Sequence, residues 1–310
     1  MKTKRTITKI LCTGLLVIFL GVLLTGQARG QIYQVNNVGN GTIGEYNLDG
    51  TTINSSLVSG LSNPQGVLVS GGNLFVTIGG SNTIGEYDAT TGATINAALI
   101  SGVSLPVGLA LSGGNLYVVS NNNGTIGEYN ATTGAAINPS LVSGLGQGFF
   151  VAVFGGNLYV TNYGLGTIGE YNATTGATIN SSLVSGLSNP VGLVVSGGNL
   201  WEANGGNNTI GEYNAATGAA INPSLVSGLN GPAGLALLGG NLFVVNNTNK
   251  TIGEYDAITG ATINASLVSG LNNPLGIAAV PEPSTWAAGL LTAGVILCSI
   301  WRRRKGFVKT

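Results

Sequence analysis

The chain of 310 residues contains 52 glycines, about 17 % against a usual share of roughly 7 %, and it has no histidine and two cysteines. Its formal charge of zero hides a segregation, because ten of the eleven lysines and arginines lie before residue 30 or after residue 301. Between residues 31 and 280 one base, Lys250, stands against ten acids, which gives this segment a net charge of −9. A basic surface that neutralises nucleic-acid phosphates is therefore excluded.

Both cysteines, Cys12 and Cys298, also lie in the terminal segments. Residues 31–280 therefore lack the thiols and imidazoles that form zinc sites, attach haem or act as thiol nucleophiles, and we expect no metal and no cofactor there. An exported domain without disulfides needs a large core or a closed architecture for its stability.

The N-terminal segment, residues 1–30, has the layout of a secretory signal peptide. Lys2, Lys4, Arg5 and Lys9 precede an apolar run over Ile10–Leu24, and small or polar residues follow up to Gly30. We expect cleavage near residue 30. The alternative is an uncleaved membrane anchor.

The C-terminal segment has three parts in sequence. Residues 281–285 begin with Pro281-Glu282-Pro283, residues 286–301 form an apolar run with a tryptophan at each end, and residues 302–310 are basic. The 16 apolar residues would span roughly 24 Å as a helix, which suits a thin bilayer. The positive-inside rule would keep the tail in the cytoplasm and stop transfer at its basic cluster. The cluster consists of Arg302, Arg303, Arg304 and Lys305.

Together, the motif, the apolar helix and the basic tail over residues 280–305 resemble the PEP-CTERM sorting signal of Gram-negative bacteria. The resemblance implies an exosortase-type processing enzyme as a partner and cleavage near Pro281-Glu282-Pro283. It also implies that the chain is first anchored in the inner membrane through residues 286–301, with residues 31–280 outside the cytoplasm, and then reaches the cell surface or an exopolysaccharide matrix. The alternative is a plain membrane anchor.

The middle of the chain is one unit repeated six times. The pentapeptide Thr-Ile-Gly-Glu-Tyr recurs at intervals of 41 or 42 residues. Its tyrosines are Tyr46, Tyr87, Tyr129, Tyr171, Tyr213 and Tyr255. A period of this length is typical of solenoids and propellers.

One period is predicted to form four short strands, over Gly108–Ser112, Asn115–Ser120, Thr125–Asn130 and Ala135–Val142, with glycine-containing turns between them. A four-stranded unit of about 42 residues has the size of a propeller blade. The first period lacks its first strand, and the chain supplies an extra one at 276–280. We therefore predict an all-β, six-bladed propeller over 31–280, closed by strand 276–280, which removes exposed sheet edges. The alternative is an open β-solenoid. The repeats resemble NHL-type or YVTN-type bacterial propellers, which implies the fold and no particular active site.

The candidate chemical groups argue against an enzyme. One glutamate recurs in each pentapeptide, but these six are expected on a strand far from the ring axis and a blade apart, so we interpret them as a structural position copied by duplication. The strands expected to line the channel contain no acid or base, whereas general acid–base catalysis needs a titratable group within reach of the substrate. The lactonase-like and streptogramin-lyase-like propeller families use acidic metal ligands or histidine, which this chain lacks at the matching places.

Departures from the repeat indicate a candidate binding site. Phe150 stands where five repeats have glycine, Phe149 precedes it, and Tyr163 replaces a loop residue of the same blade. Glu202 follows Trp201 in the next repeat, and Trp201 itself occupies a core position. Aromatic faces stack on sugars or peptide side chains. We predict that Phe149, Phe150, Tyr163 and Glu202 form a ligand-binding patch at the channel mouth; sequence drift is the alternative.

These observations favour a non-catalytic, surface-sorted propeller that binds or scaffolds exopolysaccharide or surface proteins. A second hypothesis is a hydrolase or lyase that uses a divalent cation, and it requires several acids around one ion. A third is a structural repeat protein without a specific ligand.

Overall fold

The computed structural model describes residues 30–38 and 40–281. These residues form twenty-four β-strands and no helix. Residues 31–280 make up one compact unit. The predicted signal segment up to residue 29, Glu282 and Pro283 of the sorting motif, the apolar run 286–301 and the basic tail 302–310 lie outside the described residues. In the part of the chain that is described, no helix has the length and apolar character needed to cross a bilayer.

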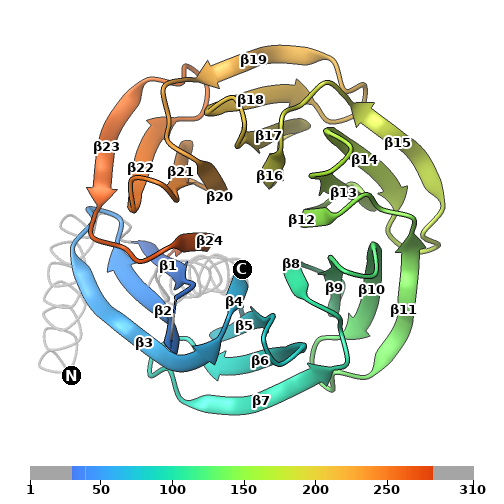
Figure 1. Cartoon of the computed structure of the whole chain (residues 1–310), viewed down its shortest axis with the longest axis vertical. Coiled ribbons are helices and arrows are strands. Elements are labelled where there is room, and N and C mark those ends of the chain that lie inside the picture. The colour runs from blue at the N-terminus through green and yellow to red at the C-terminus, as the bar shows by residue number, and fades with distance from the viewer. Residues whose placement is uncertain (1–29, 39, 282–310) are drawn as a thin grey trace, which may run out of the picture. The chain divides into compact units, whose positions relative to one another are not determined.

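The strands form six antiparallel sheets of four strands each, arranged around a central axis (Figure 1). This arrangement confirms the prediction of an all-β, six-bladed propeller with four-stranded blades. The innermost strands are β24 (Pro274–Pro281), β4 (Pro64–Ser70), β8 (Pro106–Ser112), β12 (Gly148–Phe154), β16 (Pro190–Ser196) and β20 (Pro232–Leu238). The second strands are β1 (Gly30–Asn36), β5 (Asn73–Ile78), β9 (Asn115–Ser120), β13 (Asn157–Asn162), β17 (Asn199–Asn204) and β21 (Asn241–Asn246).

The third and fourth strands complete each blade toward the rim. The third strands are β2 (Asn40–Asn47), β6 (Thr83–Asp88), β10 (Thr125–Asn130), β14 (Thr167–Asn172), β18 (Thr209–Asn214) and β22 (Thr251–Asp256). The outer strands are β3 (Thr52–Ser62), β7 (Thr94–Ser101), β11 (Ala136–Ser143), β15 (Thr178–Val184), β19 (Ala220–Val226) and β23 (Thr262–Val268). Blade 1 is β24-β1-β2-β3, and blades 2 to 6 follow in chain order from β4–β7 to β20–β23.

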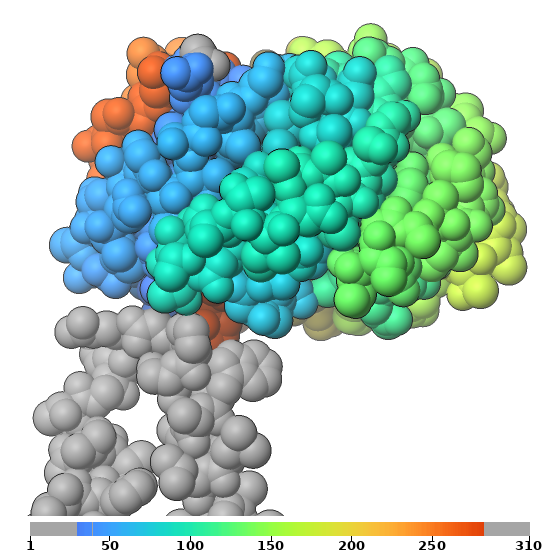
Figure 2. Space-filling view, turned by 90° about the horizontal axis from the view of Figure 1, so that it is seen from below, coloured from blue at the N-terminus to red at the C-terminus, as the bar shows by residue number. Residues whose placement is uncertain are grey.

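Blade 1 joins the two ends of the repeat region, because β24 pairs with β1. Hydrogen bonds between residues 236 positions apart fix this join. The backbone N–H of Asn272 donates to the Asn36 side chain at 3.0 Å, and the Asn273 amide donates to the carbonyl of Asn37 at 2.9 Å. Blades 1 and 6 are therefore neighbours in the ring. In the side view of Figure 2 the blue surface of blade 1 touches the orange surface of blade 6.

The repeated pentapeptide has a packing explanation. In blade 3, Ile126 is fully buried and Tyr129 is 7 % exposed. A Cβ atom on Gly127 would lie 2.6–2.9 Å from the Tyr129 ring, so only glycine lets the tyrosine fold back over its own strand. The same contact recurs in the other five blades. Thr-Ile-Gly-Glu-Tyr is therefore a core-building sequence.

A second glycine in each repeat brings neighbouring blades together. Gly134 has a φ of +69°, and a Cβ atom there would lie 1.8 Å from the carbonyl oxygen of Leu99 in the preceding blade. Equivalent approaches of 1.8–2.0 Å occur at all six seams, including the closing seam, where Gly50 of blade 1 meets Leu267 of blade 6. Glycine is thus required at this turn for two reasons. Its φ is positive, and the leucine carbonyl of the preceding blade leaves no room for a Cβ atom.

The strand bounds differ slightly from the sequence prediction. The second and third strands of blade 3 match it, but its inner strand begins at Pro106 instead of Gly108, and its outer strand is shifted by one residue to Ala136–Ser143. The closing strand spans Pro274–Pro281 instead of 276–280. Proline is tolerated as the first residue of a strand, where its missing N–H costs little, so Pro106 and Pro274 can begin these two strands.

The closing seam can be tested with two matched glycines. Gly50 and Gly72 have φ values of +84° and +85°, but an added Cβ meets the Leu267 carbonyl at 2.0 Å from Gly50 and nothing within 4 Å from Gly72. Gly72→Ala should therefore cost about 1 kcal/mol of unfolding free energy, from backbone strain alone. Gly50→Ala should cost about 2–4 kcal/mol, because overpacking adds to that strain. Equal losses in denaturant unfolding would contradict the seam contact.

Candidate functional site

The inner strands of the ring consist of apolar and neutral polar residues. The six inner strands, which lie nearest the axis in Figure 1, contain no Asp, Glu, Lys, Arg or His. No group of three or more His, Cys, Asp or Glu side chains within residues 30–38 and 40–281 could hold a metal ion.

The six repeated glutamates lie on the third strands and are held individually. In five blades the carboxylate accepts a hydrogen bond of 2.7 Å from the asparagine that begins the neighbouring second strand. These pairs are Asn73–Glu86, Asn115–Glu128, Asn157–Glu170, Asn199–Glu212 and Asn241–Glu254. An asparagine amide thus gives each carboxylate its own donor inside the blade, which agrees with a structural role for the repeated glutamate.

Blade 1 lacks this pair, because Gln31 stands where the other blades have asparagine. Its glutamate, Glu45, is 4 % exposed, and burial raises the pKa of its carboxyl above the ordinary value. Burial, and then the nearby Glu45 charge, raise the pKa of the Tyr33 phenol. The phenol oxygen lies 2.9 Å from the Gln31 side-chain oxygen and 3.1 Å from the carbonyl oxygen of Ala89 in blade 2, and these two acceptors share its one hydrogen.

Three of the four residues predicted to form a binding patch lie together on blade 4. The ring centroids of Phe149 and Tyr163 are 5.5 Å apart, and those of Phe149 and Phe150 are 6.4 Å apart. Phe149 lies in β12, and Tyr163 lies in the loop after β13. The backbone N–H of Tyr163 donates to the carbonyl of Gln147 at 3.1 Å, which ties the two segments together. All three aromatic side chains are partly exposed.

Leu165 is a further exposed apolar residue in the same loop as Tyr163, and it was not predicted from the sequence. It is 62 % exposed, and its side chain lies over Gly146, where a Cβ atom would come within 2.4 Å of the Leu165 Cγ. The equivalent positions in blades 2, 3, 5 and 6 are Ser81, Asn123, Asn207 and Asn249. An aligned repeat would have revealed this leucine as a departure. We call Phe149, Tyr163 and Leu165, with Phe150 beside them, the blade-4 apolar face.

Phe150 links this face to the seam with blade 5. Its N–H donates to the Thr161 hydroxyl at 3.0 Å, and that hydroxyl donates to the carbonyl of Val191 in blade 5 at 2.7 Å. The Phe150 ring packs against an apolar cluster that includes Leu193 and Tyr213 of blade 5. Phe150 therefore has a packing role at this seam in addition to its place beside Phe149.

The structure does not place Glu202 on the surface with the aromatic residues. Its side chain is 0 % exposed, so its predicted part in an accessible patch is wrong. The reason is strand alternation: Trp201 and Glu202 point to opposite faces of β17. Trp201 is 7 % exposed and its ring nitrogen donates to the carbonyl of Ala257 at 3.1 Å, which confirms its core role. Burial raises the pKa of Glu202 to about 8.

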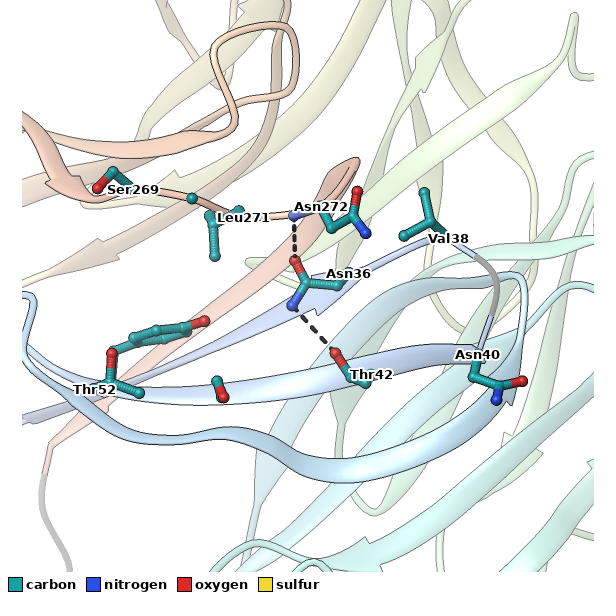
Figure 3. Close-up of a pocket in the computed structure, with 11 residues that line it drawn as sticks. Asn36, Val38, Asn40, Thr42, Thr52, Ser269, Leu271 and Asn272 are labelled. Carbon is teal, nitrogen blue, oxygen red and sulfur yellow. Dashed lines mark hydrogen bonds between the residues drawn. The ribbon is translucent and has the colours of Figure 1, made fainter.

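A polar pocket of 290 Å³ lies at the closing seam between blades 1 and 6 (Figure 3). The Asn36 side chain bridges its wall, since its oxygen accepts from the Asn272 N–H and its amide donates to the Thr42 hydroxyl at 3.2 Å. No charged residue lines it. The lining residues are Asn36, Val38, Asn40, Thr42, Tyr46, Thr52, Ser55, Ser269, Gly270, Leu271 and Asn272.

The comparisons with known proteins support the fold. A family model described as outer membrane protein assembly factor BamB matches residues 3–140, which is less than half of the chain. No curated protein matches the chain. A solved structure titled "Crystal structure of Nidogen/Laminin Complex" is similar with a TM-score of 0.69 and 16 % identity, over 81 % of this chain and 98 % of that one. At this identity the likeness is one of architecture.

The structural role of the repeated glutamate gives a prediction in blade 3. Asn115→Ala removes the 2.7 Å donor of the buried Glu128 carboxylate and should lower the free energy of unfolding by about 1–3 kcal/mol. Asn122→Ala is the control, because this exposed side chain makes only a 3.4 Å contact with Ser104, and it should cost less than about 0.5 kcal/mol. Denaturant unfolding measures both, and equal stability of the two variants would contradict the assignment.

Proposed function

We propose that this chain is a non-catalytic, exported β-propeller that binds neutral polysaccharide at the cell surface or in an extracellular matrix through its blade-4 apolar face. The observation that carries the proposal is the clustering of Phe149 and Tyr163, with ring centroids 5.5 Å apart, on a blade where aromatic residues replace those of the repeat. A non-catalytic role is supported by inner strands without a titratable side chain, since proton transfer needs such a group within reach of the substrate.

The chemistry around the face suits a neutral sugar. The flanking side chain of Gln147 is exposed, and its oxygen would lie 3.3 Å from a Cβ atom on Gly164, so an amide stands within the same pair of loops as Tyr163. Asn122 and Asn123 of blade 3 are exposed on the neighbouring loop, and Asn121 bonds the carbonyl of Gly148 at 3.0 Å. Aromatic rings cover the apolar face of a sugar, and amides bond its hydroxyls.

The route of export rests on the terminal segments. The resemblance of residues 280–305 to the PEP-CTERM signal supports sorting by an exosortase-type enzyme with transient anchoring through residues 286–301. The partial match to outer membrane protein assembly factor BamB supports a location in the cell envelope. Pro281, the first residue of the motif, ends β24 and is exposed, so cleavage after it would leave the closing strand intact.

A surface protein is the second candidate partner of the blade-4 apolar face, and the exposure of Leu165 favours it. A leucine that is 62 % exposed adds apolar area but cannot stack on a sugar ring as an aromatic side chain does. Leu165→Ala therefore separates the two partners, because it should weaken binding to a protein and leave binding to a polysaccharide within about twofold.

Binding through the blade-4 apolar face can be tested by paired phenylalanine substitutions in β12. Phe149→Ala should weaken binding to purified extracellular polysaccharide at least tenfold, and adding Tyr163→Ala should weaken it further, because each removes a stacking ring. Phe154→Ala is the matched control: Phe154 is 38 % exposed in the same strand but lies outside the face. Sedimentation with the polysaccharide measures all three. Equal loss in the control, or unchanged binding in the double variant, would reject the face.

The hydrolase or lyase hypothesis makes a separate prediction about cations. A resident divalent ion stabilises the folded state by mass action, so its removal should lower the melting temperature. We expect Ca²⁺ and EDTA to leave the melting temperature unchanged to within about 1 °C, because the glutamates are bonded singly to asparagines. A rise of several degrees with Ca²⁺ would favour the cation-dependent enzyme.

A further inference from the structure

One position of the second strand, the residue that pairs with the glycine of the pentapeptide, differs in character between blades. Four blades carry valine there, namely Val76, Val118, Val160 and Val244. Blade 1 carries Gln34 and blade 5 carries Glu202. All six side chains are buried, and Gln34 and Glu202 are 0 % exposed. The chain therefore tolerates a neutral polar side chain of glutamate's size at this position in blade 1.

Glu202 points into the seam between blades 4 and 5. In β17 it lies two residues from Leu200, and side chains two apart in a strand share a face. Leu200 packs with Tyr159 and Ile168 of blade 4. Across its own blade Glu202 pairs with Leu193 of β16 and Gly211 of β18. The Phe150 ring of blade 4 packs against the same cluster.

The seam offers the Glu202 carboxyl no compensation for a negative charge. Neither of its oxygens has a hydrogen-bond partner. On β18, Tyr213 shares its face, and burial together with the Glu202 charge raises the pKa of that phenol to about 12. Glu212 lies on the opposite face and is bonded to Asn199, while Tyr159 of β13 donates to Glu170 of β14. Strands β12 and β16 contribute no titratable side chain, and the one base of residues 31–280, Lys250, lies in the loop between β21 and β22 of blade 6.

We propose that Glu202 is held as the neutral acid in the closed ring, and that its ionisation loosens the seam between blades 4 and 5 and destabilises the propeller in alkaline medium. An isolated buried carboxylate is costly, whereas the neutral acid resembles the glutamine that blade 1 accommodates. The inference is independent of the ligand that the blade-4 apolar face binds.

The direction of the pH effect follows from the two protonation states. Burial raises the pKa of Glu202 from its ordinary value of 4.5 in an exposed chain to about 8 in the folded protein. The unfolded chain therefore releases this proton first as pH rises. The stability that the neutral side chain gives is fully present below pH 4.5, falls as pH rises toward 8, and is lost above that value.

The experiment compares melting temperatures of the full chain and three variants between pH 5.5 and 9. Glu202→Val introduces the residue of four other blades, and Glu202→Gln introduces that of blade 1. Relative to either variant, the wild type should lose about 5 °C or more of melting temperature across this range. Glu86→Gln is the matched control: it removes a buried carboxylate bonded to Asn73, and it should keep the wild-type pH slope.

Infrared difference spectra supply a readout that does not depend on stability. Wild type minus Glu202→Gln should show the C=O band of a protonated carboxyl at pH 6 and a carboxylate band at pH 9. Parallel melting profiles for the wild type and both Glu202 variants would overturn the proposal, as would a carboxylate band at pH 6. Loss of the pH slope in Glu86→Gln would also overturn it, because the effect would then not belong to Glu202.

Discussion

Backbone-to-backbone contact between blades is the constraint on which the rest of the structure depends. At every seam a turn glycine approaches a leucine carbonyl of the preceding blade so closely that even a methyl group would not fit. A second set of glycines, on five of the six inner strands, approaches the next inner strand in the same way. The ring therefore closes through the main chain, and large apolar side chains fill the layers between these contacts. Such seams need neither disulfides nor ion pairs, which agrees with the absence of cysteine and the scarcity of bases between residues 31 and 280.

This mode of assembly explains why most polar groups of the repeat are occupied structurally. The repeated glutamates are bound by asparagines within their blades, and the asparagine or aspartate after each of the last five pentapeptides caps the following turn. In a ring of nearly equal blades, a departure from the repeat stands out against five copies. Blade 4 departs on its surface, at Phe149, Tyr163 and Leu165, and also at its seam, where Phe150 replaces the glycine of the other inner strands. Blade 5 contributes Glu202 to the same seam, so the two residues that depart from the repeat, Phe150 and Glu202, share one interface.

Much of the fold could be predicted from the sequence because the period, the turn glycines and the strand formers repeat. The closing strand followed from counting, since the first repeat lacks an inner strand and the end of the repeat region supplies one.

The environment of Glu202 was harder to predict, because which face of β17 meets blade 4 depends on how the blades stack. Four valines at its position were the available signal, and they mark it as interior. The asparagine partners of the glutamates were also missed, because they lie 13 residues away on a neighbouring strand. The pocket at the closing seam depends on the loop of blade 1, where Tyr33 and Tyr46 are one residue further apart than the equivalent residues of blades 2 to 6.

We propose that the blade-4 apolar face is the surface of this propeller that contacts a polysaccharide. Hydrogen–deuterium exchange of the full chain, with and without a purified neutral extracellular polysaccharide, tests this proposal. We expect slower exchange in the two loop segments 146–150 and 162–166 when the polysaccharide is present, with the equivalent loops of blades 2 and 6 unchanged. Slower exchange spread evenly over all six blades, or confined to the closing seam between blades 6 and 1, would contradict it.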